Sequence, residues 1–261
     1  MRRGVTPAGL AGLAIGLAFL YIPLALVVLF SFNASRLVTV WAGASLRWYG
    51  EMLSNAALLD AAGVSLAVGI LSATFASIIG LLVGIVLARL SRFPGRTAFS
   101  GLAHVPLVLP EVITGLGLLL LFVALDWDRG FVTIVLAHAT FSTAFVAILV
   151  HARLVDFDRA LEEAAMDLGA TPLVAFCRIT LPLISPTLVA GWLLAFTLSL
   201  DDLVIASFVS GPGATTLPMR LYSQMRLGVT PEINAASTVM IAVVGVAVIG
   251  ASLLQKRQAA P

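Results

Sequence analysis

Long stretches without a charged residue recur along the chain. Five have roughly membrane-spanning length, and a sixth is interrupted only by Glu111. In chain order the six are Gly4–Ser35, Ala61–Ala88, Thr97–Leu125, Gly130–Ala152, Ile179–Leu200 and Ile233–Gln255. A bilayer core about 30 Å thick needs about 20 apolar helical residues, whereas barrel strands are alternating segments of about 10 residues. The pattern therefore predicts an all-α polytopic membrane protein with six transmembrane helices.

We expect the spans at approximately 8–32, 61–88, 98–125, 130–152, 183–209 and 233–254, within one domain of residues 1–261. Composition agrees, since 60% of residues are hydrophobic and 11% are charged, against about a quarter charged in soluble domains. Arg2 and Arg3 precede the first apolar run, as in a signal peptide, but the run far exceeds an h-region of about 7–15 residues. We therefore expect a retained first span.

The placement of basic residues predicts the orientation. With a cytoplasmic N-terminus, ten of the 15 basic residues lie inside: Arg2, Arg3, Arg89, Arg92, Arg96, Arg153, Arg159, Arg178, Lys256 and Arg257. The other five lie outside: Arg36, Arg47, Arg129, Arg220 and Arg226. This bias favours cytoplasmic N- and C-termini. A net charge of +2 gives no reason to expect a nucleic-acid partner, and the only cysteine, Cys177, is expected to be a reduced thiol on the inner side.

Two of the predicted spans carry features of a substrate pathway. Pro106, Pro110 and nearby glycines distort the third span, and broken membrane helices tend to line cavities. Glu111 lies at this break. Asp201 and Asp202 follow the fifth apolar run. Inserting a carboxylate at the membrane centre costs about 2.5–3.5 kcal/mol, so such a residue usually faces protein or water. The pair could attract a cationic substrate; capping a helix or pairing with an arginine at a subunit interface is the alternative.

Other polar and aromatic residues have simpler interpretations. His104, His138 and His151 are too far apart for a local metal site, and His138 is expected to be a hydrogen-bonded core residue. Trp41, Trp48 and Tyr49 lie in the outer segment after the first span. They are expected in the interfacial belt, with contact to an external partner as the alternative.

The segment from Arg153 to Thr180 is predicted to form a helix–turn–helix outside the membrane. Asp156 and Asp158 can cap the start of a helix over residues 160–168, and Gly169 supplies the stop. Thr171 followed by Pro172 is the start signal of the next helix. The segment contains Glu163-Ala164-Ala165, three residues, Gly169, nine residues, and then Ile179-Thr180-Leu181-Pro182.

This spacing resembles the EAA loop of ABC importer permeases, EAA-x3-G-x9-I-x-LP, with every anchor present. The resemblance implies a type I (MetI-like) permease fold whose coupling loop, approximately 153–182, carries a short coupling helix that sits in a cleft of a cytoplasmic ATPase subunit. The residues implied in ATPase coupling are Glu162, Glu163, Ala164, Ala165, Asp167, Gly169 and Pro182. An ordinary surface helix is the alternative for Glu-Ala-Ala alone.

Further stretches are similar to permeases of bacterial polyamine importers, the putrescine type in particular. They are Ser31-Phe32-Asn33, LVTVWAGASLRWY at 37–49, PLVLPEVITG at 106–115, GWLLAFTLSLDDLVIASFVSGPGATTLP at 191–218 and PEINA at 231–235. The resemblance implies an inner-membrane complex of this chain, a homologous second permease, two copies of an ATPase and a periplasmic polyamine-binding protein. The substrate expected is putrescine, with spermidine as the alternative.

The chain itself is not expected to hydrolyse ATP. A P-loop needs a lysine after a glycine-rich turn, and the only lysine, Lys256, follows Leu253-Leu254-Gln255. We therefore expect no cofactor or metal in this subunit, with ATP and magnesium bound by the partner ATPase. The alternatives are an ABC permease for another small cationic or organic solute and an ion-coupled secondary transporter. A secondary transporter would not need an EAA loop.

Overall fold

The computed structural model describes residues 6–37, 40–90, 92–228 and 230–258, with the side chains of 7–8 and 251–258 left out. Arg2 and Arg3, and the side chains of Lys256 and Arg257, therefore lie outside the described residues. The described chain is helical apart from connecting segments and an isolated bridge between Asn33 and Ala44. Its helices are α1 (Pro7–Ser31), α2 (Arg47–Ser54), α3 (Ala56–Arg89), α4 (Arg96–Val108), α5 (Glu111–Ala124), α6 (Phe131–Val155), α7 (Ala160–Asp167), α8 (Pro172–Ala175), the π-helix η1 (Phe176–Thr180), α9 (Leu181–Asp201), α10 (Val204–Val209), α11 (Leu217–Leu227) and α12 (Pro231–Gln258).

Candidate membrane spans account for most of this helical structure. Within the described residues, five helical stretches are long and apolar enough to cross a membrane, at 9–31, 56–89, 131–155, 172–201 and 231–250. The pair α4 and α5 passes the same test jointly but is bent by 116°. The predicted all-α membrane fold is confirmed, and the bent pair supplies the sixth candidate span.

The bend between α4 and α5 follows from Pro110. A proline disfavours helical geometry in the residue before it, and Leu109 is extended, with ψ at 134°. Pro110 then serves as the N-cap of α5, and Glu111 lies in the first turn, where a carboxylate is favoured by the helix dipole. The sequence predicted a break here, and the structure places it at these two residues.

The segment predicted as one span at 183–209 is divided into two helices. Helix α9 ends at Asp201, and α10 begins at Val204. Asp202 is extended, with ψ at 121°, and its carboxylate accepts the backbone N–H groups of Ile205 and Ala206 at 3.2 and 2.7 Å. Because these N–H groups belong to the first turn of α10, Asp202 acts as a helix cap at the break.

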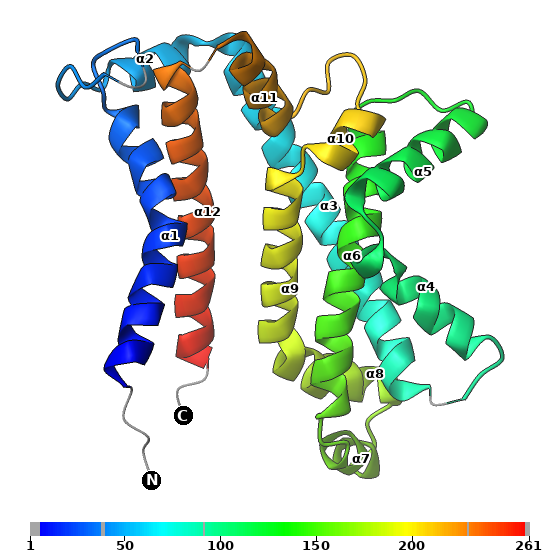
Figure 1. Ribbon diagram of the computed structural model, residues 1–261. Coiled ribbons are helices and arrows are strands. Elements are labelled where there is room, and N and C mark those ends of the chain that lie inside the picture. The colour runs from blue at the N-terminus through cyan, green and yellow to red at the C-terminus, as the bar shows by residue number, and fades with distance from the viewer. Residues whose placement is uncertain (1–5, 38–39, 91, 229, 259–261) are drawn as a thin grey trace. The chain divides into compact units, whose positions relative to one another are not determined.

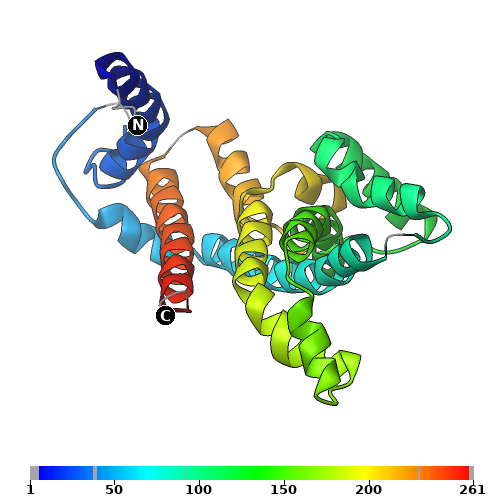
Figure 2. The same ribbon diagram turned by 90° about the horizontal axis from the view of Figure 1, so that it is seen from below.

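The chain forms two compact units, residues 60–220 with 246–261 and residues 1–59 with 221–245. In the first of these units α6 is the most buried of the membrane-length helices, and Figure 2 looks nearly along it, with α9 on one side and α4 and α5 on the other. Its core joins residues from α3, α5, α6, α10 and the loop after α10: Val68, Phe122, Ile134, Val135, Ala137, Ile205, Ala206, Val209 and Ala214. In Figure 1, α7 and α8 lie at one end of α6 and α9, and α10 lies at the other end.

Close packing of α3 against α6 depends on two glycines one turn apart. A Cβ added at Gly80 would lie 2.7 Å from the Cβ of Val146, and one added at Gly84 would lie 2.7 Å from Cγ1 of Val150. Small residues at such spacing let membrane helices approach closely.

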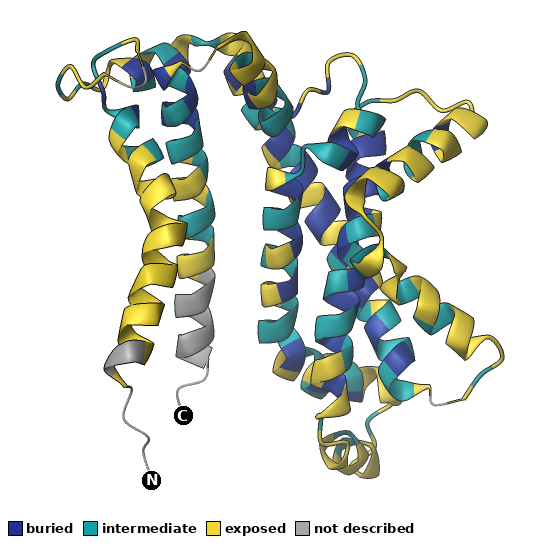
Figure 3. Ribbon diagram, in the orientation of Figure 1, coloured by how far each residue is buried: buried dark blue, intermediate teal, exposed yellow. Residues whose placement is uncertain are grey.

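The other unit contains α1, whose side chains are exposed from Gly9 to Leu26, whereas its last turn is partly covered and Ser31 is buried (Figure 3). A helix that is apolar all round suits contact with lipid. In the segment after it, Trp48 is buried and donates Nε1–H to the Asn33 carbonyl at 2.6 Å, and the hydroxyl groups of Tyr49 and Ser31 are 2.7 Å apart. Trp48 and Tyr49 therefore stabilise this segment, whereas Trp41 is exposed, and the position of these aromatic residues in an interfacial belt stays a prediction.

Candidate functional site

The first feature of the site is the turn that ends α7. Gly169 has φ at +93°, a left-handed conformation that glycine adopts without strain. Its N–H donates to the Met166 carbonyl at 2.9 Å, and the N–H of Ala170 donates to the Ala165 carbonyl at 3.0 Å. This pair of bonds is a Schellman motif. Thr171 then caps α8 by accepting the N–H of Val174, so the predicted helix–turn–helix is present.

One side of α7 is attached to the rest of the chain through Glu162. Its two carboxylate oxygens accept hydrogen bonds from the two terminal nitrogens of Arg89, at 2.5 and 2.7 Å, in a bidentate ion pair. The hydroxyl of Thr180, which is fully buried, donates to the same carboxylate. Arg89 is the last residue of α3 and Thr180 the last of η1. Glu162 therefore joins α7 to two other elements.

Charge around Glu162 holds its carboxyl group ionised. The hydrogen bonds from Arg89, together with those from Thr180 and the charge of Arg159, lower the pKa of Glu162 against the opposing effect of burial. A lowered pKa means that the stabilisation is present at neutral pH and is lost only as pH falls through the lowered value. The same region is tied by Arg159, which donates to the Ala88 carbonyl at 3.3 Å, and by Arg89, which lies over the ring of Phe157.

The opposite side of α7 is open. Glu163, Ala164 and Asp167 are exposed, and Asp167 lies four positions after Glu163 and three after Ala164, the spacings of neighbours on one helical surface. Leu168 is 91% exposed and Leu173 is 71% exposed in the turn and helix that follow. Leu168 lies between the candidate membrane spans, and Leu173 lies in the first turn of the span at 172–201. We call Glu163, Ala164, Asp167, Leu168 and Leu173 the outer surface of the α7 loop.

The remaining residues of the predicted coupling set have other environments. Ala165 is half-buried on the same side as Glu162. Pro182 is exposed at the second position of α9, directly after η1. The structure therefore brings six of the seven predicted residues together in α7 and its turn and leaves Pro182 at the start of α9.

The three predicted pathway carboxylates differ in their surroundings. Asp202 is engaged by its own chain: besides capping α10, it lies 3.0 Å from Nε2 of His138, and the two side chains are 9% and 2% exposed. Nδ1 of His138 is 2.7 Å from the hydroxyl of Ser199, as expected of a core histidine. Asp201 and Glu111 are exposed. Two carboxylates thus face outward at the two helix breaks.

Sequence reasoning missed the partners of these groups. The sequence indicated Arg89 only as a basic residue at the end of an apolar run, and Thr180 only as the unspecified residue between Ile179 and Leu181 in the EAA pattern. Nothing in either position signals a contact with Glu162. The pairing of His138 with Asp202 also joins residues 64 positions apart in the sequence, with no local pattern that indicates it.

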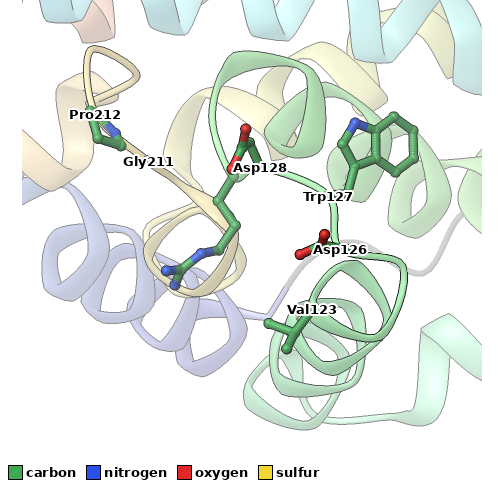
Figure 4. Close-up of a pocket in the computed structure, with 7 residues that line it drawn as sticks. Val123, Asp126, Trp127, Asp128, Gly211 and Pro212 are labelled. Atoms are coloured by element: carbon green, nitrogen blue, oxygen red, sulfur yellow. The ribbon is translucent and has the colours of Figure 1, made fainter.

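A shallow pocket lies near α10, away from α7. It measures about 290 Å³ and is lined by the loop after α5 and the segment after α10: Val123, Asp126, Trp127, Asp128, Arg129, Gly211 and Pro212. Figure 4 shows the carboxylate of Asp126 and the ring of Trp127 in this loop. A Cβ at Gly211 would collide with the carbonyl of Arg129, so glycine permits the close approach of the two segments.

Apolar helices of membrane length, a short polar helix after α6 and carboxylates at two helix breaks are typical of membrane transport components. Residues 80–260 match the family described as "Binding-protein-dependent transport system inner membrane component". The chain belongs to this family. The prediction that the chain is an ABC importer permease is confirmed. That residues 1–261 form a single domain stays a prediction.

Individual relatives agree. The chain is 58% identical over 240 residues to the putrescine transport system permease protein PotI of Escherichia coli (strain K12), covering 90% of this chain and 85% of that protein. It is 41% identical over 239 residues to the spermidine/putrescine transport system permease protein PotC of the same strain, covering 92% and 90%. A bacterial alginate ABC transporter shares the fold, with a TM-score of 0.72, 18% identity and coverage of 96% and 93%. The chain is therefore a transport component of the inner membrane and not an enzyme.

Proposed function

We propose that the chain is the translocation subunit of an ATP-driven importer that brings polyamines, putrescine first, from the periplasm to the cytoplasm. The observation that carries this proposal is the 58% identity to a putrescine permease along 90% of the chain. The 41% identity to a spermidine/putrescine permease supports the same class of substrate. Spermidine is the alternative substrate.

The outer surface of the α7 loop is the docking site for the ATPase in this proposal. Exposed Leu168 and Leu173 provide apolar area, Ala164 permits close approach, and Glu163 and Asp167 offer negative charge to a basic partner. The complete importer contains this chain, a homologous second permease, two copies of the ATPase, which bind ATP and magnesium, and a periplasmic polyamine-binding protein. The α7 end of the bundle and both termini are cytoplasmic, in agreement with the basic-residue bias.

Asp201 and Glu111 are the groups proposed to meet the substrate. Putrescine and spermidine are flexible polycations, and two exposed carboxylates at helix breaks attract such cations by charge. Asp202 has a separate role, because His138 and the first turn of α10 already occupy its oxygens.

Uptake in cells tests the proposal. A strain that keeps the other importer components and lacks this chain is compared with the same strain after the chain is restored. Labelled putrescine should accumulate only in the restored strain, and excess unlabelled spermidine should compete whereas an uncharged sugar should not. Equal putrescine uptake in both strains, with the chain present in the membrane fraction, would contradict the proposal.

A further inference from the structure

Glu162 and Glu163 are adjacent residues of α7, but they have opposite surroundings. Glu163 is exposed on the outer surface of the α7 loop, whereas the side chain of Glu162 is 13% exposed and faces the protein. Adjacent helical positions point about 100° apart, which accounts for the difference. Only Glu163 is therefore available to a docked ATPase.

The contacts of Glu162 bind α7 to the ends of two long helices. Arg89 ends α3, and its guanidinium, 21% exposed, holds both oxygens of Glu162. Thr180 directly precedes Leu181, the first residue of α9, and its hydroxyl donates to the same carboxylate. A bidentate arginine–carboxylate pair is geometrically specific as well as strong. One side chain thus links the coupling loop to α3 and α9 together.

The segment between α7 and α9 interrupts the backbone connection of the two helices. It contains a turn at Gly169, the one-turn helix α8 and the π-helix η1. Because α8, η1 and α9 form one continuous helical stretch over residues 172–201, the backbone break from α7 lies at the turn of Gly169, and the π-helical part is of a kind that often occurs at functional sites. A side-chain link across this segment bypasses it.

We propose that Glu162 is a positioning residue that fixes the coupling helix to α3 and α9, so that a displacement of α7 by the ATPase moves the ends of both helices together. This inference rests on the proposed function, in which α7 contacts the ATPase. Arg89 and Thr180 are its partners within the chain. Two weaker links join this loop to α3: a single hydrogen bond of 3.3 Å from Arg159 to the Ala88 carbonyl, and the contact of Arg89 with the ring of Phe157.

The test uses the complete importer in proteoliposomes with putrescine-loaded binding protein. In Glu162→Gln the neutral amide cannot form the ion pair with Arg89, so uptake and the stimulation of ATP hydrolysis should fall roughly tenfold, which is within the usual range of coupling between sites. The importer should still assemble with its ATPase. Asp156→Asn is the matched control: the same change, on an exposed carboxylate in the same loop, should leave uptake at the wild-type level.

A double-mutant cycle separates linkage from general damage. If Glu162 and Arg89 act as one pair, Arg89→Gln should lower uptake as Glu162→Gln does, and the double variant should lose no more than either single variant. Normal uptake in Glu162→Gln, losses that multiply in the double variant, or a loss of assembled complex in proportion to the loss of uptake would each overturn the inference.

A third variant separates failure of this inference from failure of the proposed function. Glu163→Lys should reduce co-purification of the ATPase, because it reverses charge on the outer surface. If Glu163→Lys disrupts assembly while Glu162→Gln transports normally, only the linkage is wrong. If neither variant changes assembly or stimulated hydrolysis, α7 is not the coupling element, and both the linkage and the proposed role of α7 fail.

Discussion

Substitution of Gly169 should impair transport in a graded order set by backbone geometry. The residue has φ at +93°, and no atom lies within 4 Å of an added Cβ, so conformation alone decides the cost. Alanine in a left-handed conformation costs about 1–2 kcal/mol, whereas asparagine adopts it more readily. Proline is fixed near φ of about −65° and cannot form this turn at all.

Proline also removes a hydrogen bond. The Gly169 N–H donates to Met166 at 2.9 Å, and a bond of this kind contributes about 0.5–1.5 kcal/mol. A cost of 1–2 kcal/mol for alanine corresponds to a factor of about 5–30 in the population of the intact turn. We therefore expect Gly169→Asn to transport nearly normally, Gly169→Ala to lose several-fold, and Gly169→Pro to lose transport completely.

Putrescine uptake and hydrogen exchange together provide the assay. Exchange of the Ala170 amide, which donates to the Ala165 carbonyl, reports the turn directly. Its protection should fall in the same order as uptake, while the amount of chain in the membrane stays constant. Wild-type uptake in Gly169→Pro, or an order in which alanine is tolerated better than asparagine, would refute the reasoning.

Three further outcomes are expected. Asp201→Asn should lower polyamine uptake several-fold while the amount of chain in the membrane stays normal. Asp202→Asn should instead reduce the amount of folded chain, because it weakens charge-assisted hydrogen bonds of about 1.5–3 kcal/mol each. Equal behaviour of the two variants would count against these separate roles. Gly80→Leu should lower the thermal stability of the detergent-solubilised chain, because overpacking against α6 costs about 1–3 kcal/mol, and an unchanged melting temperature would show that the helices can separate. In a chain with Cys177 replaced by serine, a cysteine at Thr215 should react with an impermeant reagent from outside intact spheroplasts and one at Ala160 should not; the reverse pattern would invert the topology.

The sequence predicted those features that depend on local chemistry. Apolar runs of membrane length set the positions of the long helices, Pro110 marked the break before α5, and Gly169 with Thr171 and Pro172 marked the turn after α7. Each of these signals acts on the backbone within a few residues of itself. They are therefore readable without knowledge of the fold.

Features that depend on tertiary contacts were not predictable in the same way. The end of α9 at Asp201 accompanies the capping of α10 by Asp202, whose carboxylate lies 3.0 Å from Nε2 of His138 in α6. The inward position of Glu162 depends on Arg89, which is 73 residues away in the sequence. The pattern grouped Glu162 with Glu163 because the two are adjacent; only the fold distinguishes an internal anchor from an exposed contact.

Accumulation of labelled putrescine in proteoliposomes tests the central claim most directly. The vesicles hold the complete importer, with ATP trapped on the side of α7 and the loaded binding protein on the opposite side. The account predicts accumulation against a gradient only when ATP is present, and none when Glu163→Lys replaces the wild-type chain. Accumulation driven by an ion gradient without ATP, at the same rate in both chains, would contradict the account and indicate a secondary transporter.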